Sequence, residues 1–236
     1  MTIWYGLKNC KSKDLENIFL TASGGPFYKT SLNKFKKIKV SDALKHPNWK
    51  MGKKISIDSA TMMNKVFEIV EAKKIFNLSY KKLSILIHPK SYVHAIIKFK
   101  NGLTKIVAHD TNMKIPIFNS LYSSNNFINS KKLNLKILNN LSLKEINYKR
   151  FSVIKIINKL PKNSSLFETI LVSINDKLVE LFLANKIKFT DISKKMHNIL
   201  DLKEFKKYKM IKPRKIYDII FLNNKIRGKI EFKNKV

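Results

Sequence analysis

Short apolar runs separated by turn-forming stretches occupy the first 120 residues, whereas apolar side chains recur with a helical period after residue 150. Residues 15–22 form an apolar run that stops at Ser23-Gly24-Gly25-Pro26, which predicts a strand followed by a sharp loop. Between about Ser59 and Phe76, apolar residues lie four apart (Met62, Val66 and Val70). This spacing predicts one long helix, with Asp58 or Ser59 as its N-cap.

The middle of the chain has the pattern of a β-hairpin followed by a linker. Residues 83–88 are rich in β-forming side chains and end at Pro89. The segments 92–99 and 103–108 flank Asn101-Gly102, a pair typical of tight hairpin turns. Residues 121–150 are rich in Asn, Ser and Lys, which favours a linker.

The last third of the chain is predicted to be helical. One apolar stripe with helical spacing consists of Phe167, Ile170, Leu171, Ile174, Leu178, Leu181 and Phe182. Asp191 is a candidate cap for the next helix, residues 215–223 predict another, and residues 225–236 are expected to form a basic tail. The sequence therefore predicts an α+β domain with a mixed or antiparallel sheet and a long helix over residues 1–122. A linker at 123–149 and a small all-α C-terminal domain at 150–236 complete the prediction.

The composition supports a folded chain and limits the cellular compartments in which we expect it. The 236 residues are 44% hydrophobic and 11% aromatic, which argues against a disordered polyelectrolyte. No apolar run approaches the roughly 20 residues of a membrane span, and the N-terminus lacks the pattern of a secretory signal. The single cysteine, Cys10, excludes a disulfide framework and a cysteine metal cluster. We therefore expect a cytoplasmic protein.

The net charge of +32 has two interpretations. Only three of the 48 basic residues are arginines, and the lysines are scattered along the whole chain. Base reading and phosphate forks favour arginine, so this pattern fits an AT-rich coding sequence better than selection for nucleic acid. The alternative, a functional basic surface, predicts DNA binding with a steep dependence on salt.

Three segments contain residues suited to chemistry, and each also has a purely structural interpretation. In Thr21–Phe27, two glycines after a strand could present backbone N–H groups, with the Ser23 hydroxyl, to a phosphate. The alternative is an ordinary turn. In Asp58–Glu68, the side chains of Asn64, Lys65 and Glu68 project from one helix face, where they could bind a phosphate beside a divalent metal. The alternative is a solvated face with a Lys–Glu pair.

The third segment is His46-Pro47-Asn48-Trp49-Lys50-Met51. A tryptophan in a polar loop predicts a lid that closes over a ligand, unless it packs onto the core. His88 and His94 are either catalytic neighbours or strand histidines with hydrogen-bond partners. His109-Asp110 is expected in a loop, without a role.

Together these segments, with Leu86–Ser91, His94 and Pro116, resemble the 1-deoxy-D-xylulose 5-phosphate reductoisomerase family. The resemblance covers nearly the whole chain, including Asn185–Ile192 in the predicted helical domain. It implies a NADP-dependent oxidoreductase that rearranges and reduces 1-deoxy-D-xylulose 5-phosphate to 2-C-methyl-D-erythritol 4-phosphate. This reaction belongs to the non-mevalonate route to isoprenoids and uses NADPH with Mg²⁺ or Mn²⁺. Residues 1–122 would then form the catalytic, substrate-binding and dimerisation domain of a homodimer.

The resemblance also implies a role for individual residues. Those that would bind the substrate are Ser23, His46, Ser59, Asn64, Lys65 and Glu68. Trp49 would be the lid and, with Glu68 and His94, would belong to the catalytic group. Met51 and Gly52 would lie near the nicotinamide of NADPH, and Glu68 would bind the metal.

The sequence departs from the family pattern in four ways. No Gly-rich strand–helix turn of a dinucleotide-binding domain is found, and the Asp-Ser-Glu segment with two further metal ligands has no counterpart. Val66-Phe67 replaces a common Gly-Leu, which could crowd the helix, and Asn175-Asp176 replaces Asn-Glu, which puts a helix–helix contact in doubt. We therefore expect a fragment that lacks the cofactor domain, acting as half of a split enzyme with a separate N-terminal piece, or a non-catalytic remnant. The remaining alternative is a basic nucleic-acid-binding protein, which no recognised motif supports.

Overall fold

The computed structural model describes residues 2–46, 51–122 and 126–233, which pack as two compact units. The sheet unit consists of residues 2–25, 67–122 and 126–147, and the helical unit consists of residues 26–46, 51–66 and 148 onward. Neither unit is a continuous segment, because residues 26–46 and 51–66 of the helical unit lie in sequence between Gly25 and Phe67 of the sheet unit.

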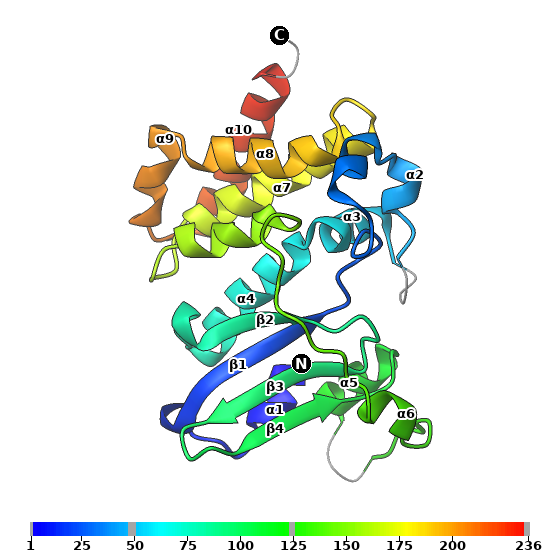
Figure 1. Ribbon diagram of the computed structural model, residues 1–236. Helices are drawn as coiled ribbons and strands as arrows, with labels where there is room; N and C mark the ends of the chain where they lie inside the picture. The colour runs from blue at the N-terminus through cyan, green and yellow to red at the C-terminus, as the bar shows by residue number, and fades with distance from the viewer. Residues whose placement is uncertain (1, 47–50, 123–125, 234–236) are drawn as a thin grey trace. The chain divides into compact units, whose positions relative to one another are not determined.

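A four-stranded mixed sheet forms the centre of the sheet unit (Figure 1). The strands are β1 (Leu15–Ala22), β2 (Leu83–Ile87), β3 (Val93–Phe99) and β4 (Thr104–Ala108), in the order β2-β1-β3-β4. β1 is parallel to β2 and antiparallel to β3, and β3 is antiparallel to β4. The predicted strand at residues 15–22 and the predicted mixed sheet are confirmed.

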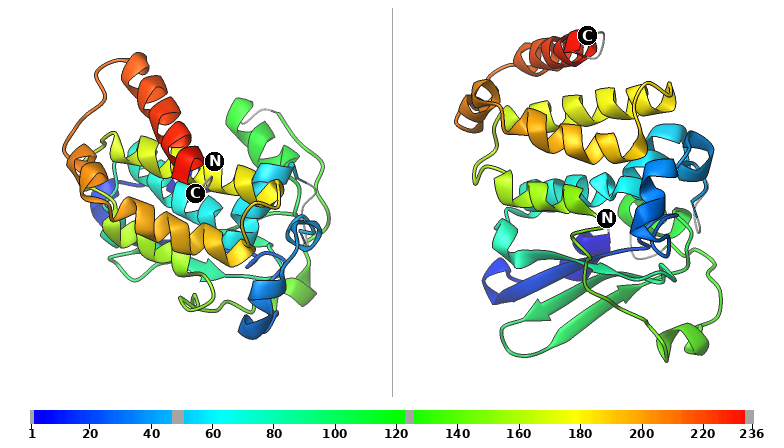
Figure 2. Two further views of the ribbon diagram at one scale, coloured as in Figure 1. Left: turned by 90° about the horizontal axis from the view of Figure 1, so that it is seen from above. Right: turned by 45° about the horizontal axis from the view of Figure 1, so that its top comes forward.

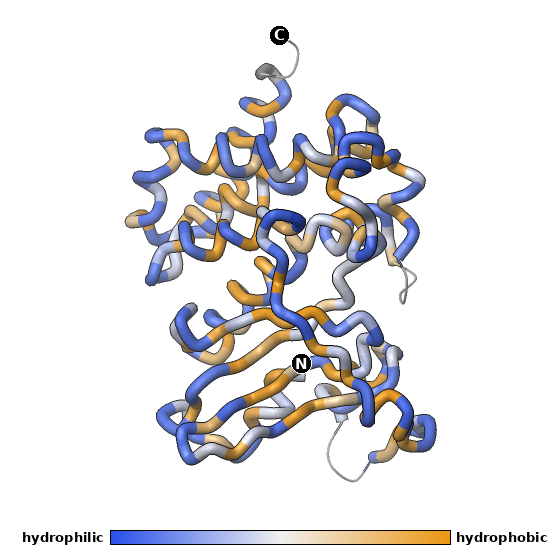
Figure 3. The backbone as a smooth tube through the Cα atoms, viewed as in Figure 1, coloured by the Kyte–Doolittle hydropathy of each residue, from blue (hydrophilic) through white to orange (hydrophobic). Residues whose placement is uncertain are grey.

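The predicted hairpin is confirmed as well. Gly102 has a φ of +87°, a conformation that favours glycine, and its N–H donates to the carbonyl of Phe99. The Asn101 side chain accepts a hydrogen bond from the Leu103 N–H. Figure 3 shows apolar residues along β1 and β3, with hydrophilic residues at the hairpin tip. The hairpin turn and the apolar residues of the strands therefore favour the same pairing of β3 with β4.

The short helix α1 (Thr2–Leu7) packs closely against the sheet through a glycine. A Cβ added at Gly6 would lie 2.4 Å from Ile97 Cδ1 and 3.0 Å from Val107 Cγ2. Both contacts come from the strands of the hairpin. Only a residue without a side chain allows this approach.

The remainder of the sheet unit has little regular structure. It contains α5 (Lys114–Leu121), α6 (Leu135–Leu138) and the 3₁₀ helices Ser12–Asp14 and Tyr80–Lys82. Within the predicted linker, Ile87 and Lys144 exchange two backbone hydrogen bonds. The strand β2 thereby gains a partner on its outer side.

The single long helix predicted from about Ser59 to Phe76 is wrong, because two helices occupy this part of the chain. The first, α3 (Lys53–Thr61), ends at Met62, and the second, α4 (Met63–Phe76), follows directly. Met62 has a left-handed conformation with φ of +69° although it is not a glycine, and it is fully buried. The apolar spacing continues across the break, so the period alone could not reveal it. Asp58 is therefore not an N-cap but a buried residue within α3.

The helical unit is built around α7 (Phe167–Leu183), which contacts both α8 (Phe189–Leu200) and α10 (Ile216–Lys233) (Figure 2). The shorter elements are α2 (Val40–Ala43), α9 (Lys203–Lys206) and the 3₁₀ helices Leu32–Lys37, Ser152–Lys159 and Lys207–Lys209. The predicted apolar stripe of α7 is confirmed, since all seven of its residues are buried. None of the described helices is long and apolar enough to cross a membrane.

One detail of the helical prediction needs correction, and another is confirmed. The basic tail expected from residue 225 is helical through Lys233, because Leu222, Ile226 and Ile230 form a buried stripe that extends α10. Asp191 caps α8 as predicted: it lies in the first turn, and its carboxylate accepts a hydrogen bond from the Lys188 N–H at 2.9 Å. It thereby satisfies a backbone donor at the helix start.

The close approach at Gly6 gives a prediction about stability. In the Gly6→Ala variant the new methyl group displaces Ile97, so we expect a net loss of about 1–2 kcal/mol in the free energy of unfolding. The matched control is Gly228→Ala in α10, where an added Cβ meets nothing within 4 Å. This control should gain about 0.5–1 kcal/mol from helix propensity. Urea unfolding measures both, and equal effects of the two variants would contradict the packing at Gly6.

Candidate functional site

The Ser-Gly-Gly loop leaves the sheet unit at the end of β1. Gly24 and Gly25 have φ of +86° and +66°, so two consecutive residues adopt the left-handed conformation that glycine allows. The Gly25 N–H donates to the Ser23 hydroxyl at 3.2 Å. The predicted sharp loop is confirmed, and Ser23 is half-buried within it. At least one of its backbone donors points at the serine side chain.

The segment after this loop is anchored within the helical unit by an arginine and a group of aromatic rings. The Arg150 guanidinium donates to the carbonyls of Phe27, at 2.7 Å, and of Thr30. It also lies 5.3 Å from the centre of the Phe35 ring. Phe27 and Phe35 in turn make edge-on contacts with Phe189 at the start of α8. This anchoring fixes the course of the chain between the glycine loop and His46.

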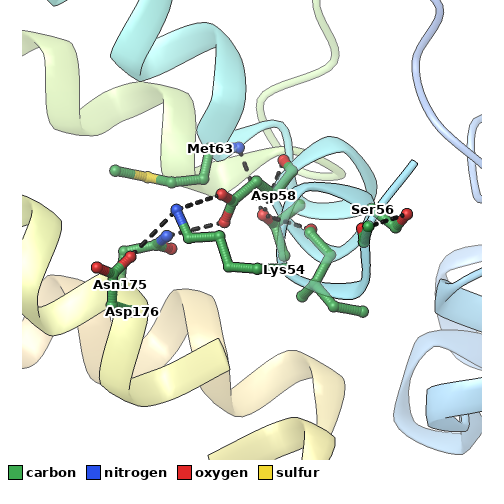
Figure 4. A network of polar contacts seen from close by, with 9 residues as sticks. Lys54, Ser56, Asp58, Met63, Asn175 and Asp176 are labelled. Carbon is green, nitrogen blue, oxygen red and sulfur yellow. Dashed lines mark hydrogen bonds and ion pairs between the residues drawn. The ribbon is translucent and has the colours of Figure 1, made fainter. Parts of the chain in front are cut away.

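A buried polar network joins α3 to α7 (Figure 4). The Asn175 amide donates to one carboxylate oxygen of Asp58 at 2.8 Å, and the Lys54 ammonium lies 2.7 Å from the other. Lys54 also lies 3.1 Å from Asp176. The doubt about the helix–helix contact at Asn175-Asp176 is thereby removed, because both residues bind the segment that precedes Ser59. Sequence reasoning missed Lys54 and Asn175 as partners of Asp58.

The carboxylate of Asp58 is the group most affected by this environment. Its side chain is 3% exposed, whereas that of Lys54 is 47% exposed. Burial raises the pKa of Asp58, and the hydrogen bonds from Asn175 and Lys54 offset this only in part. Burial opposes the charge of Lys54 too, but Asp58 and Asp176 raise the net pKa of its ammonium. In this ion pair, burial therefore disfavours the charged form of Asp58, whereas the charged form of Lys54 is favoured overall.

The residues after the helix break are arranged by Thr61. Its hydroxyl donates within α3 and accepts the Met63 N–H at 3.3 Å, which satisfies one free donor at the start of α4. Asn64 and Lys65 therefore lie in the first turn of α4, which contains no acidic residue. Glu68 follows one turn later on the same helix, three residues after Lys65 and four after Asn64, the spacing on which the predicted shared face rests.

Asn64 has an unusual feature at its amide. Its Oδ1 atom is buried and has no hydrogen-bond partner among the described residues. Buried acceptors are nearly always satisfied, so such an atom calls for a donor from outside the described residues, for example from a bound ligand. Ser59, on the last turns of α3, is also buried, at 5% exposure.

Three of the remaining candidate residues belong to the helical unit. His46 is half-buried, and burial lowers the pKa of its imidazole. Met51 is half-buried, and Gly52 is exposed at the N-cap of α3 with open space where a Cβ would be. Trp49, the predicted lid, lies outside the described residues.

The histidines of the sheet unit differ in their surroundings. His94 in β3 is half-buried, and its Nε2 donates to the backbone carbonyl of His109 at 3.2 Å. The two imidazole rings are stacked with their centres 3.7 Å apart. His88 is fully buried at the end of β2, and burial lowers the pKa of its ring, so it is neutral at pH 7. His94 is thus a strand histidine with partners.

The candidate residues are divided between the two units. Ser23, Glu68 and His94 belong to the sheet unit, and the helical unit contributes His46, Met51, Gly52, Ser59, Asn64 and Lys65. No group of three histidine, cysteine or acidic side chains that could hold a metal ion occurs among the described residues. Glu68 is the single acidic residue of the candidate set.

The network around Asp58 predicts unequal effects at two neighbouring residues of α7. Replacement of Asn175 by alanine leaves a buried carboxylate oxygen without its donor, so the free energy of unfolding should fall by about 2–3 kcal/mol. Asp176→Ala removes only a contact to a half-exposed lysine and should cost less than about 1 kcal/mol. Denaturant titration of both variants tests the difference, and a larger loss for Asp176→Ala would contradict the network.

The raised pKa of Asp58 also predicts a dependence on pH. The unfolded chain binds this proton with a pKa of about 3.9, and the folded chain holds it to higher pH. The stability from Asp58 is therefore complete below the unfolded pKa and is lost as pH rises through the folded pKa. The Asp58→Asn variant cannot ionise, so its stability relative to the wild type should increase with pH across this window and then level off. A difference that is flat or falls with pH would be inconsistent with the burial of an ionised carboxylate.

Family models match two parts of the chain. The model of the 1-deoxy-D-xylulose 5-phosphate reductoisomerase C-terminal domain matches residues 1–76. A second model, the DXP reductoisomerase C-terminal domain, matches residues 109–229, which is more than half of the chain.

Relatives and solved structures agree with these models. The 1-deoxy-D-xylulose 5-phosphate reductoisomerase of Pelagibacter ubique is 62% identical over 97% of this chain and 59% of the relative. That of Persephonella marina is 39% identical over 93% of this chain and 58% of the relative. The chain therefore spans somewhat over half the length of the curated relatives that it matches.

The fold is also similar to that of solved reductoisomerase structures. The structure of DOX-P reductoisomerase in complex with NADPH, fosmidomycin and magnesium has a TM-score of 0.85 and 32% identity, over 95% of this chain and 56% of that one. The Zymomonas mobilis enzyme in complex with NADPH has a TM-score of 0.80 and 29% identity, over 94% of this chain and 57% of that one. From its motifs, its fold and these matches, the chain belongs to the 1-deoxy-D-xylulose 5-phosphate reductoisomerase family.

Proposed function

We propose that this chain provides the substrate-binding part of an NADPH- and divalent-metal-dependent enzyme that converts 1-deoxy-D-xylulose 5-phosphate to 2-C-methyl-D-erythritol 4-phosphate. The observation that carries the proposal is the first turn of α4. It combines a lysine, no acidic residue, and the buried amide oxygen of Asn64, which has no donor among the described residues. A phosphorylated sugar offers both an anion and hydroxyl donors, and so matches both features.

The charges at this turn suit the phosphate group. The Lys65 ammonium and the partly positive start of the helix both favour an anion. Ser59, one turn before the break, has a hydroxyl that can donate to a phosphate oxygen. Asn64 Oδ1 can only accept, so it would bind a sugar hydroxyl rather than an ionised phosphate oxygen. Its amide nitrogen remains able to donate.

The other site residues are assigned on the family resemblance. Ser23 and His46 would bind the same end of the substrate as Lys65. Trp49 would close over the substrate as a lid, and His94 would act near the reacting carbons. Met51 and Gly52 would lie beside the nicotinamide, and the open space at Gly52 is compatible with the approach of a ring.

The proposal that a metal ion and NADPH take part rests on solved structures of relatives, not on a complete binding site among the described residues. The solved relatives are described in complex with magnesium and NADPH. Mg²⁺ prefers about six oxygen ligands, and among the candidate residues Glu68 is the single carboxylate. The described residues therefore do not make up a metal site by themselves. We propose that Glu68 binds the ion together with carboxylates from a segment outside these 236 residues.

The same proposal covers the domains and the oligomer. Residues 1–122 would bind the substrate and form a homodimer. Residues 123–149 would be a linker, and residues 150–236 would form the helical C-terminal domain. The alternative of a non-catalytic remnant keeps the fold but predicts no restored activity with an upstream half. The alternative of a nucleic-acid-binding protein predicts tight, salt-sensitive binding to duplex DNA.

Substrate binding to the full 236-residue chain tests the proposal. Calorimetric titration with 1-deoxy-D-xylulose 5-phosphate should show binding that Lys65→Gln weakens by about 10-fold or more, because a charged hydrogen bond is lost. Asn64→Ala should weaken binding by about 5-fold through the loss of one hydrogen bond. The matched control is Lys74→Gln, which removes the same charge from an exposed position of α4.

The control separates a specific site from general attraction to a basic chain. If Lys74→Gln weakens binding as much as Lys65→Gln, the phosphate is held by net charge and the proposed site is wrong. Addition of a polypeptide with the family's cofactor domain and Asp-Ser-Glu segment should restore NADPH oxidation in the presence of Mg²⁺ or Mn²⁺. Intact substrate binding without such restoration would favour the remnant.

A further inference from the structure

A β-bulge displaces His94 from the regular pattern of its strand. Val93 pairs with Ala108 and Ala95 pairs with Val107, so His94 is the extra residue on β3 with no partner position on β4. Bulges redirect a side chain and are frequent near active sites. Here the bulge places the His94 ring at the end of β4, where the chain continues into His109.

His109 contacts His94 in two ways. Its ring is stacked on the His94 ring, with centres 3.7 Å apart and planes inclined by 14°. Its backbone carbonyl accepts a hydrogen bond from His94 Nε2 at 3.2 Å. The backbone of His109 is itself held by the Tyr92 carbonyl, which accepts its N–H at 3.1 Å. The position of His109 is therefore fixed from the same hairpin that carries His94.

These bonds determine the tautomers of both rings. A carbonyl can only accept, so His94 Nε2 must carry hydrogen, and the lone pair of the neutral ring is then on Nδ1. His109 Nδ1 donates to the Asp110 carbonyl at 2.6 Å, which leaves the lone pair on Nε2. That Nε2 atom is buried and has no partner among the described residues. The two rings therefore present opposite tautomers.

We propose that His109 is the positioning residue of His94: its stacked ring and its carbonyl hold the His94 imidazole in one orientation, with Nε2 protonated and the lone pair on Nδ1. The importance of this for catalysis rests on the proposed function, in which His94 is an active-site histidine. The geometry itself depends only on the hairpin.

The surroundings of His109 oppose its protonation. Protonation of His109 at Nε2 would bury an N–H without an acceptor among the described residues. Burial lowers the pKa of the His109 ring, although the hydrogen bond to the Asp110 carbonyl and the charge of Asp110 act in the opposite direction. The Asp110 carboxylate is itself bound by the Lys131 N–H at 2.9 Å. These surroundings favour the neutral His109 ring, with its hydrogen on Nδ1.

Nitrogen NMR of the full chain, labelled with ¹⁵N-histidine, tests the assignment without substrate. The wild type should show His94 as the Nε2–H tautomer and His109 as the Nδ1–H tautomer, assigned with His94→Gln and His109→Gln. His109→Phe keeps a flat ring for stacking and should preserve the His94 signal. His109→Ala removes the ring and should give an average of the two His94 tautomers. The signals of His46, His88 and His197 report that each variant is folded.

Two results would overturn the proposal. One is a wild-type His94 with its hydrogen on Nδ1, which requires no variant to observe. The other is an unchanged His94 signal in folded His109→Ala, which would show that the ring of His109 has no effect. In an enzyme completed with the upstream polypeptide, His109→Ala should lower kcat about 10-fold with little change in KM, and His109→Phe should restore it. Absence of turnover in the wild type would refute the proposed function but leave the NMR result intact.

Discussion

The arrangement of the proposed phosphate site depends on one buried carboxylate. An ionised aspartate without partners costs several kcal/mol to bury, so Asp58 can occupy the interior of α3 only when Asn175 and Lys54 bind it. Asn175 lies 117 residues away in sequence, on the central helix of the helical unit. Through this bond, α7 fixes the helix on which Ser59 lies. The left-handed Met62 and the hydroxyl of Thr61 then set the start of α4, and with it Asn64 and Lys65.

In the sheet unit, backbone geometry places a candidate side chain, the ring of His94. The bulge at His94 removes its ring from the strand alternation, and the hairpin returns the chain so that His109 stacks on it. Gly6 lets α1 approach the same hairpin at Ile97 and Val107. A packed hairpin of this kind holds a histidine ring more firmly than a loop would, as the role proposed for His94 would require.

The distribution of acidic residues bears on the large positive charge. The chain has 16 acidic residues against 48 basic ones, yet many acids occur at defined structural positions. Four of them accept backbone N–H groups around helix starts, namely Asp42, Glu168, Asp191 and Asp218. Others neutralise a buried cation, since Glu180 and Glu231 both bind Lys177. Many acidic residues therefore occupy positions where they stabilise helix starts or a buried cation, whereas the lysines are scattered along the chain. This distribution agrees with compositional drift rather than with a selected basic surface.

The sequence by itself determined the elements whose signals are local. Apolar runs bounded by turn residues gave the strands, Asn101-Gly102 gave the hairpin, and the spacing from Phe167 to Phe182 gave the central helix. The motifs around Ser23, His46 and Asn64 identified the family. Only the tertiary structure decided the helix break at Met62, the partner of Asp58 and the stacking of His109 on His94. The reason is that a left-handed methionine interrupts no apolar period, and that contacts between residues far apart in sequence are fixed by packing, which no local pattern records.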